Sequence, residues 1–109
     1  MELSGYRFMW LITLFDLPVD TKEARRQYAK FRTFLLEDGF TRMQFSVYKR
    51  HCPSKENALV HIQRIKRKLP PDGEVRILAI TDTQFERMHI FLGKMRKRPE
   101  VGYQQLEFF

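Results

Sequence analysis

A nearly unbroken apolar run extends from Phe8 to Leu17 and is followed by Pro18. A short run this rich in aromatic and branched side chains is typical of a strand buried on both faces, so we expect it at the centre of a sheet. Proline cannot donate to a strand ladder, and Pro18 therefore ends the strand. Asp16 is the only charged residue in the run, and it should lie at the rim of the sheet because a carboxylate is rarely buried unpaired.

Apolar residues at helical spacing predict two helices further along the chain. The first is expected to begin at Asp20, which forms a capping-box variant with Glu23, and to end at Gly39. The second is expected over about residues 55–69, with Ser54 as its N-cap. The apolar stripes are Ala24, Tyr28, Phe31 and Leu35 in the first helix, and Ala58, Ile62, Ile65 and Leu69 in the second.

Residues 40–50 alternate between apolar and polar side chains, which is the period of a strand. The predicted apolar face carries Met43, Phe45 and Val47, and the predicted polar face carries Gln44, Ser46, Tyr48 and Arg50. This segment is long for one strand, so it forms either two successive strands or one bent strand.

The rest of the chain predicts a strand, a short helix and a tail. Residues 74–81 alternate as a strand, Thr83 and Glu86 form a second capping box, and Gly93 ends the short helix. A basic linker follows, and residues 103–109 are a candidate for a final short strand.

This order of elements predicts an α+β protein, a ferredoxin-like βαββαβ sandwich with an antiparallel sheet and two helices on one face. We expect a ferredoxin-like domain over residues 1–93, followed over 94–109 by the linker and a dimer-docking strand. A second protomer is the economical cover for the open sheet face, and the C-terminal strand would then add to the sheet edge of the partner.

The charge balance points to a polyanionic partner. Twenty basic residues against thirteen acidic ones give a net charge of +7, which favours nucleic acid. Arg25, Arg26, Arg64, Arg67 and Lys68 are the candidate phosphate contacts, although each could equally belong to a solvated helix face. The single cysteine, the absence of a signal peptide and an apolar run too short to span a bilayer favour a cytoplasmic protein without membrane contact.

Asp16 carries the strongest candidate chemistry. It is either an ordinary strand-end turn residue or a metal ligand, and in a twofold dimer two copies could hold a hydrated Mg²⁺ against a phosphodiester. Ser46 either contacts phosphates or belongs to a solvated sheet face. Asp72 and Asp82 are expected to serve as a turn former and a helix-start residue, and His51, His61, His89 and Cys52 lack the spacing of a zinc site.

Several segments occur in an order and spacing that match one known family. They are Leu14–Val19, Lys30–Leu35, Gly39–Phe40, Gln44–Tyr48, Leu69–Arg76 and Thr81–Phe85. The strand-end Asp16 and the Gln-x-Ser-Val-Tyr segment are the most specific of these features. Together they resemble the CRISPR-associated Cas-two family over nearly the whole chain, most closely its members from systems with a single large effector nuclease.

The resemblance implies a ferredoxin-like homodimer that acts in spacer acquisition. In that role the dimer sits between two dimers of the integrase subunit and spans a duplex DNA prespacer. The resemblance also implies a Mg²⁺-dependent endonuclease activity on RNA or DNA, with Asp16 as the metal ligand and catalytic residue. Ser46 lies in the matching polar strand segment.

Three hypotheses for function follow. The first is a non-catalytic scaffold that binds duplex phosphates without reading sequence. The second is a metal-dependent endonuclease that uses paired Asp16 side chains. The third is a small RNA-binding module on the same fold, which would need exposed aromatic residues on the sheet. We favour the scaffold, because one carboxylate per subunit, without a clear general base, is insufficient for efficient hydrolysis.

Overall fold

The computed structural model describes residues 9–94, so the expected strand over 103–109 and almost all of the 94–109 segment lie outside the described residues. Four strands and three helices form this part of the chain. In order they are β1 (Met9–Asp16), α1 (Lys22–Glu37), β2 (Thr41–Gln44), β3 (Val47–Cys52), α2 (Lys55–Arg67), β4 (Glu74–Thr81) and α3 (Asp82–Glu86).

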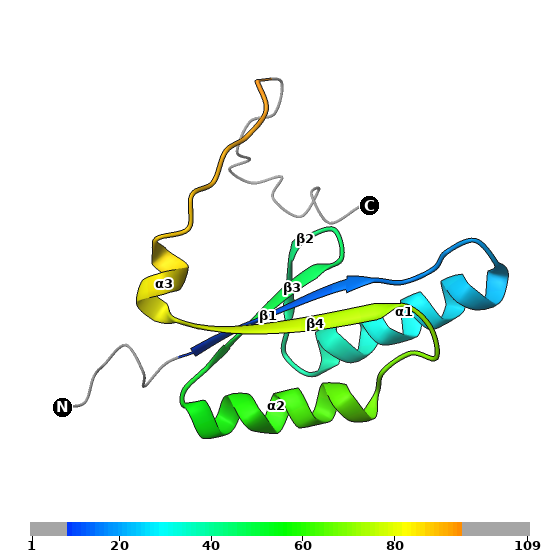
Figure 1. The fold of residues 1–109 in the computed structure, drawn as a ribbon, viewed down its shortest axis with the longest axis horizontal. Coiled ribbons are helices and arrows are strands. Elements are labelled where there is room, and N and C mark those ends of the chain that lie inside the picture. Colours follow the sequence, from blue (N-terminus) through cyan, green and yellow to red (C-terminus); the bar gives the residue numbers. More distant parts are fainter. Residues whose placement is uncertain (1–8, 95–109) are drawn as a thin grey trace.

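The strands form one antiparallel sheet in the order β2-β3-β1-β4, and α1 and α2 cover the same face of it (Figure 1). This arrangement confirms the predicted ferredoxin-like sandwich. It also confirms the central position of β1, which pairs with β3 on one side and β4 on the other.

Alternate residues of β1 supply the centre of the core. Leu11 and Phe15 are buried among Phe31 and Leu35 of α1 and Ile65 of α2. The Phe15 and Phe31 rings meet in an edge-on arrangement with centroids 5.2 Å apart, a favourable geometry for aromatic pairs. The apolar stripes of both helices therefore face the sheet, as their spacing predicts, with the exception of Leu69.

The second face of the sheet is only partly covered. Trp10 stacks on Phe85 of α3 with ring centroids 4.1 Å apart, which shields one end of this face. Further along, Leu14 of β1 is 37% exposed and Leu78 of β4 is 53% exposed. Within residues 9–94 the predicted burial of β1 on both faces is therefore incomplete.

Two predicted helix starts are wrong by one or two residues. Thr21, not Asp20, is the N-cap of α1, because its hydroxyl accepts a 3.0 Å hydrogen bond from the amide of Ala24. Thr81, not Thr83, caps α3 in a full capping box with Gln84, since β4 runs directly into the helix. Ser54 caps α2 as predicted.

The helix ends agree with the prediction at α1 and differ from it at α2 and α3, since α3 ends at Glu86 and not at the predicted Gly93. Gly39 follows the last residues of α1 with φ of 89°, and the amides of Gly39 and Phe40 donate to the carbonyls of Leu36 and Leu35. This is the predicted glycine stop, built as a Schellman motif. In contrast, α2 ends at Arg67, so Leu69 lies beyond the helix and is 51% exposed.

The segment 40–50 resolves into two strands joined by a tight turn at Phe45 and Ser46. Gln44 pairs with Val47, and Ser46 takes φ of 61°. The polar face predicted for this segment is wrong at Tyr48, which points toward the helices and is 2% exposed. The reason is that β3 faces the two helices on the side that carries Tyr48 and Cys52, so this phenol fills part of the core.

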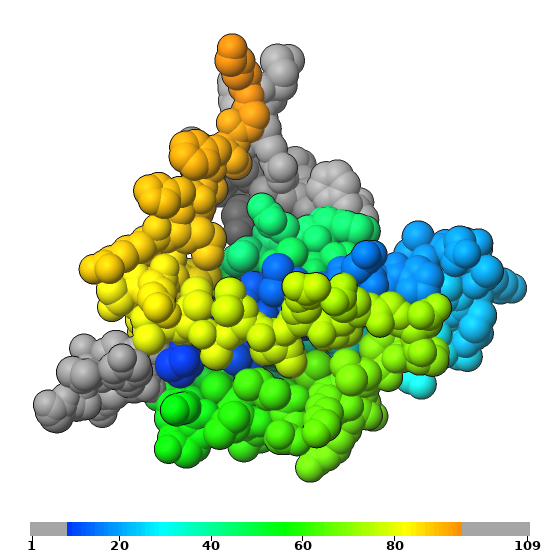
Figure 2. All heavy atoms as spheres, in the orientation of Figure 1, coloured from blue at the N-terminus to red at the C-terminus, as the bar shows by residue number. Residues whose placement is uncertain are grey.

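After α3 the chain leaves the sheet and extends away from the body of the molecule (Figure 2). Ile90 and Phe91 in this segment are 61% and 87% exposed. No helix within residues 9–94 is long and apolar enough to cross a membrane. The domain division at residue 93 stays a prediction.

Candidate nucleic-acid interface

Asp16 occupies the end of β1 and is exposed at the rim of the sheet, as its sequence context predicts. Its partner in the ladder is Glu74, the first residue of β4. Two carboxyl-bearing residues therefore face each other across adjacent strands. The Glu74 carboxylate accepts from the guanidinium of Arg76 at 2.9 and 3.2 Å, which offsets one of these two charges.

A close backbone contact fixes the position of Asp16. Gly73 has φ of 95°, and a Cβ atom at this residue would lie 2.7 Å from the Asp16 carbonyl oxygen. The Gly73 amide donates to the side chain of Asp72 at 2.7 Å, so Asp72 is the turn former that we predicted. The turn before β4 can therefore press against the end of β1 only because glycine is present.

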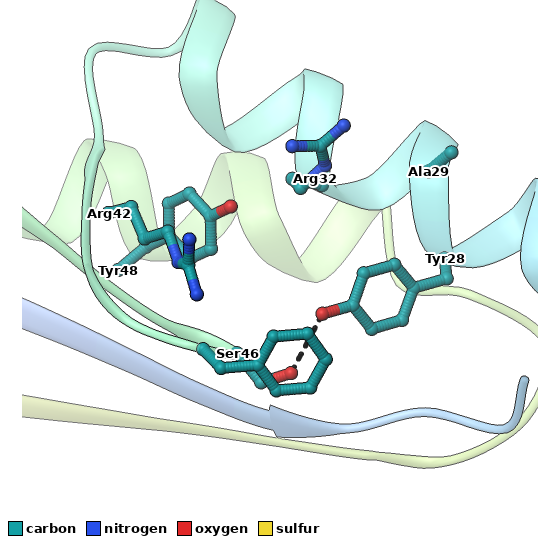
Figure 3. Close-up of a pocket in the computed structure, with 7 residues that line it drawn as sticks. Tyr28, Ala29, Arg32, Arg42, Ser46 and Tyr48 are labelled. Carbon is teal, nitrogen blue, oxygen red and sulfur yellow. Dashed lines mark hydrogen bonds between the residues drawn. The ribbon is translucent and has the colours of Figure 1, made fainter. Parts of the chain in front are cut away.

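Ser46 lies beside this acidic strand end. The amide of Phe15 donates a 3.0 Å hydrogen bond to the Ser46 carbonyl, and both Ser46 and Asp16 line a shallow hollow of about 210 Å³. The Ser46 hydroxyl is 2.8 Å from the Tyr28 hydroxyl of α1, a hydrogen bond that turns it toward the helix layer (Figure 3). The structure thus brings two candidate site residues together at one end of the sheet.

The donor types at this rim suit Mg²⁺, which takes one or two carboxylates and completes its shell with water and phosphate oxygens. Asp16 would be the protein ligand, with Glu74 as a neighbouring carboxylate. Within residues 9–94, however, no group of three His, Cys, Asp or Glu side chains could hold a metal. At this rim, the described part of one subunit would therefore offer such an ion two carboxylates and no closed protein cage.

Basic side chains gather at the same end of the fold. Arg25 and Arg26 belong to the start of α1, and Arg67 and Lys68 to the end of α2, and all four are exposed. Figure 1 shows the start of α1 and the end of α2 at the end of the molecule where β1 runs out. Arg25 donates to the Val19 carbonyl at 3.0 Å, and Arg26 pairs with Glu23 within its own helix.

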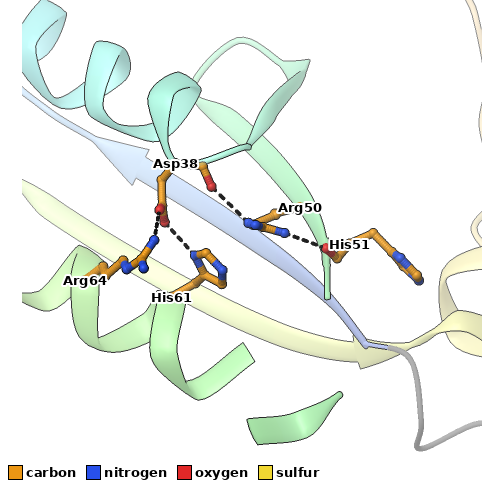
Figure 4. A network of polar contacts seen from close by, with 5 residues as sticks. All are labelled: Asp38, Arg50, His51, His61 and Arg64. Carbon is orange, nitrogen blue, oxygen red and sulfur yellow. Dashed lines mark hydrogen bonds and ion pairs between the residues drawn. The ribbon is translucent and has the colours of Figure 1, made fainter. Parts of the chain in front are cut away.

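Arg64 has a structural partner. It donates to one carboxylate oxygen of Asp38 at 2.7 Å, and His61 contacts the other oxygen at 2.7 Å (Figure 4). The side chains of Asp38 and His61 are only 6% and 4% exposed. This network ties the end of α1 to the middle of α2, so Arg64 contributes to the helix layer whether or not it meets a ligand.

A second cavity lies next to Ser46, and the sequence analysis did not predict it. It measures about 150 Å³ and is lined from α1 by Tyr28 and Arg32 and from the β2–β3 hairpin by Arg42, Ser46 and Tyr48 (Figure 3). Arg32 lies off the apolar stripe of its helix, which was visible in the sequence. Its meeting with the hairpin depends on tertiary packing, which periodicity does not reveal.

The aromatic residues do not favour an RNA-binding sheet. Such a sheet would need exposed aromatic rings, and the ring of Trp10 on β1 is already stacked on Phe85.

The geometry defines a small α+β protein with an acidic strand end, basic helix ends and a ferredoxin-like sheet. A family model described as CRISPR associated protein Cas2 matches residues 9–88. The chain therefore belongs to the Cas2 family of CRISPR-associated proteins, which confirms the resemblance seen in its sequence motifs.

Relatives support the same family over nearly full length. A protein from Parvibaculum lavamentivorans is 54% identical over 93% of this chain and 100% of its own. Another from Flavobacterium psychrophilum is 45% identical over 99% of this chain and 94% of its own. Both are named CRISPR-associated endoribonuclease Cas2. A solved structure titled "Crystal structure of cas2" matches the fold with a TM-score of 0.56 at 20% identity, covering 86% of this chain and 99% of that one.

Proposed function

We propose that this Cas2-family chain is a homodimeric, nucleic-acid-binding subunit of CRISPR adaptation, which holds duplex prespacer DNA together with the integrase subunit. The observation that carries the proposal is the cluster of exposed cations at the start of α1 and the end of α2, at one end of the sheet. Exposed Lys and Arg side chains bind phosphates without reading base sequence, which is the behaviour a prespacer holder needs.

The incompletely covered sheet face supports the homodimer. Leu14 and Leu78 are exposed on this face, and Phe91 is 87% exposed on the segment that leaves the sheet. Leu14 and Leu78 are diagonal neighbours on this face, and contiguous exposed apolar patches typically mark an interface. A twofold dimer would bury the sheet faces against each other and give the segment after α3 a surface to pack on.

The acidic rim supports a scaffold more than an efficient nuclease. Within the described residues, the hollow at this rim is lined by the carboxylates of Asp16 and Glu74, and Glu74 is already paired with Arg76. Ser46 is hydrogen-bonded to Tyr28 and has no described histidine or carboxylate partner that could accept its proton. General acid–base catalysis needs such a partner within hydrogen-bond reach of the reacting group.

A Mg²⁺-dependent endonuclease that cleaves RNA or DNA is the second candidate function, favoured by the names of the relatives and by the shared hollow of Asp16 and Ser46. Paired Asp16 side chains of a dimer would hold the ion. When bound, Mg²⁺ would polarise the phosphodiester and lower the pKa of a coordinated water. Asp16 would then serve as the catalytic residue, and Ser46 would orient a phosphate oxygen.

One experiment separates the two functions. The protein is mixed with a Cas2-partner integrase and a short duplex, and integration is measured beside cleavage of single-stranded RNA and of duplex DNA. For a scaffold, Asp16→Ala leaves integration within about twofold of the unmodified protein, because phosphate contacts remain. For an essential nuclease, the same substitution and a metal chelator abolish cleavage and integration together.

A further inference from the structure

The cavity between α1 and the β2–β3 hairpin is separate from the acidic rim and has the opposite chemistry. Its described lining residues include the two cations Arg32 and Arg42 and three hydroxyl groups, and none of them is acidic. Figure 3 shows these side chains projecting from the helix on one side and from the hairpin on the other. A volume of about 150 Å³ is small enough for one compact anionic group.

The hydroxyl groups retain hydrogen-bonding capacity toward a ligand. Tyr28 and Ser46 lie 2.8 Å apart, and either oxygen can act as the donor. Two hydroxyl groups carry two protons, and their mutual hydrogen bond uses one of them. The other proton can be donated to an acceptor in the cavity.

Tyr48 is held in its protonated form at the back of the cavity. Burial raises the pKa of its phenol, and the neighbouring guanidinium groups of Arg32 and Arg42 only partly oppose that rise. With only 2% of the residue exposed, the neutral phenol remains a donor at neutral pH. The O–H group of this neutral phenol can donate to an acceptor in the cavity.

We propose that this cavity is a phosphate-binding pocket, in which Arg32 and Arg42 pair with the oxygens of one phosphate group and the hydroxyls of Tyr28, Ser46 and Tyr48 line its wall. Guanidinium groups bind phosphate oxygens through parallel N–H donors, and the pocket adds O–H donors around the same group. Assigning that phosphate to the backbone of a bound nucleic acid rests on the proposed function.

Ser46 places this pocket next to the acidic rim without merging the two. Its carbonyl accepts from Phe15 beside Asp16, and its hydroxyl meets Tyr28 in the pocket. A strand anchored by one phosphate at Arg32 and Arg42 would pass near the rim, where a carboxylate repels the backbone unless a cation lies between them. The pocket therefore acts as a fixed anchor point at the hairpin turn.

The first test uses inorganic phosphate and the ¹⁵N side-chain resonances of the arginines, with chloride at matched ionic strength as the comparison. Phosphate should shift the signals of Arg32 and Arg42 saturably while that of Arg87, an exposed residue after α3, stays with the chloride control. Arg32→Gln should weaken the interaction at least about tenfold, because a charge-assisted hydrogen bond is lost. Equal shifts at all three arginines would overturn the pocket.

The second test measures binding of a short duplex by fluorescence anisotropy over a range of salt concentrations. Arg32→Gln and Arg42→Gln should each weaken binding more than the matched control Arg87→Gln and reduce the salt slope by about one. Tyr28→Phe keeps the aromatic ring and removes one hydroxyl group, so it tests the pocket without disturbing the fold. This variant should also weaken duplex binding.

The outcomes separate this inference from the proposed function. If phosphate binds in the pocket but Arg32→Gln and Arg42→Gln affect duplex binding no more than Arg87→Gln, the nucleic-acid assignment is overturned. If the unmodified protein binds no duplex, the proposed function fails and the nucleic-acid assignment fails with it. The phosphate titration supports or overturns the pocket itself in either case.

Discussion

The amide of Phe15 donates a 3.0 Å hydrogen bond to the carbonyl of Ser46, and this bond joins the end of β1 to the turn between β2 and β3. Asp16 follows Phe15 directly, so the acidic rim and the hairpin turn hold fixed positions relative to each other. Since the Ser46 hydroxyl also meets Tyr28 at 2.8 Å, one turn residue connects the strand end, the hairpin and α1.

Gly73 should be intolerant of any side chain. Its φ is 95°, and a Cβ atom added there would lie 2.7 Å from the Asp16 carbonyl oxygen, so Gly73→Ala should destabilise the fold by about 1–3 kcal/mol. Urea denaturation followed by circular dichroism measures this loss. Gly93→Ala is the matched control, because a Cβ atom there meets nothing within 4 Å, and equal effects of the two substitutions would contradict the account.

The buried pair of Asp38 and His61 should be a major contributor to stability. Among the described side chains, His61→Ala leaves the Asp38 carboxylate, which is 6% exposed, with Arg64 as its partner, and the expected loss is about 3 kcal/mol. Arg64→Gln should cost less, because the Arg64 side chain is 52% exposed. The two free energies of unfolding are compared in urea, and a larger loss for Arg64→Gln would refute the assigned roles.

Part of this fold could be predicted from the sequence, and part depends on tertiary contacts. The apolar run before Asp16, the stop at Gly39 and the alternation of residues 74–81 predict the fold, because each depends on local periodicity or backbone freedom. The pairing of Asp38 with His61 is not visible in the chain, since it joins residues from the end of α1 and from α2 that no spacing rule connects. The N-caps Thr21 and Thr81 were not identified, because neighbouring hydroxyl and carboxyl residues are equally suitable caps by sequence.

The residues of the candidate site also fall into those that the sequence predicts and those that only the tertiary structure reveals. Asp16 was selected because it interrupts an apolar run, and its exposure at the strand end agrees with that interpretation. Glu74 opposite Asp16 requires the register of β1 with β4, and the meeting of Arg32 with Arg42 requires the hairpin to fold against α1. Both are tertiary relationships, which local pattern does not specify.

Cys52 should be unreactive in the folded protein, and stability should fall at alkaline pH. Burial raises the pKa of its thiol, with smaller opposing effects from Arg50. Since the unfolded thiol ionises first, stability present below about pH 9 is lost as the pH rises toward the higher folded pKa. The free energy of unfolding is measured from about pH 8 to about pH 10.

The control for this pH dependence is Cys52→Ala, which should flatten the lower part of the decline. Burial also raises the pKa of Tyr48, whose ordinary value is 10.0, so the decline should continue above that range in both proteins. Rapid labelling of Cys52 by a thiol reagent in the native state at neutral pH would contradict the burial argument.

Exposed cations should determine the salt dependence of nucleic-acid binding. Arg67 and Lys68 lie exposed at the end of α2, and replacing both by Gln should reduce the slope of log affinity against log salt by about two. Arg26→Gln should have a smaller effect, because Glu23 already offsets its charge at 3.0 Å. Anisotropy titrations with one duplex measure both slopes, and an unchanged slope for the double variant would exclude these residues from the interface.

Integration of a short duplex by the reconstituted complex with an integrase subunit tests the central claim most directly. The complex is assembled with unmodified protein, with Asp16→Ala and with the Arg67→Gln, Lys68→Gln double variant. A scaffold predicts that integration survives the loss of Asp16 and falls when the basic helix end is neutralised. Loss of integration with Asp16→Ala, together with full activity of the double variant, would contradict it.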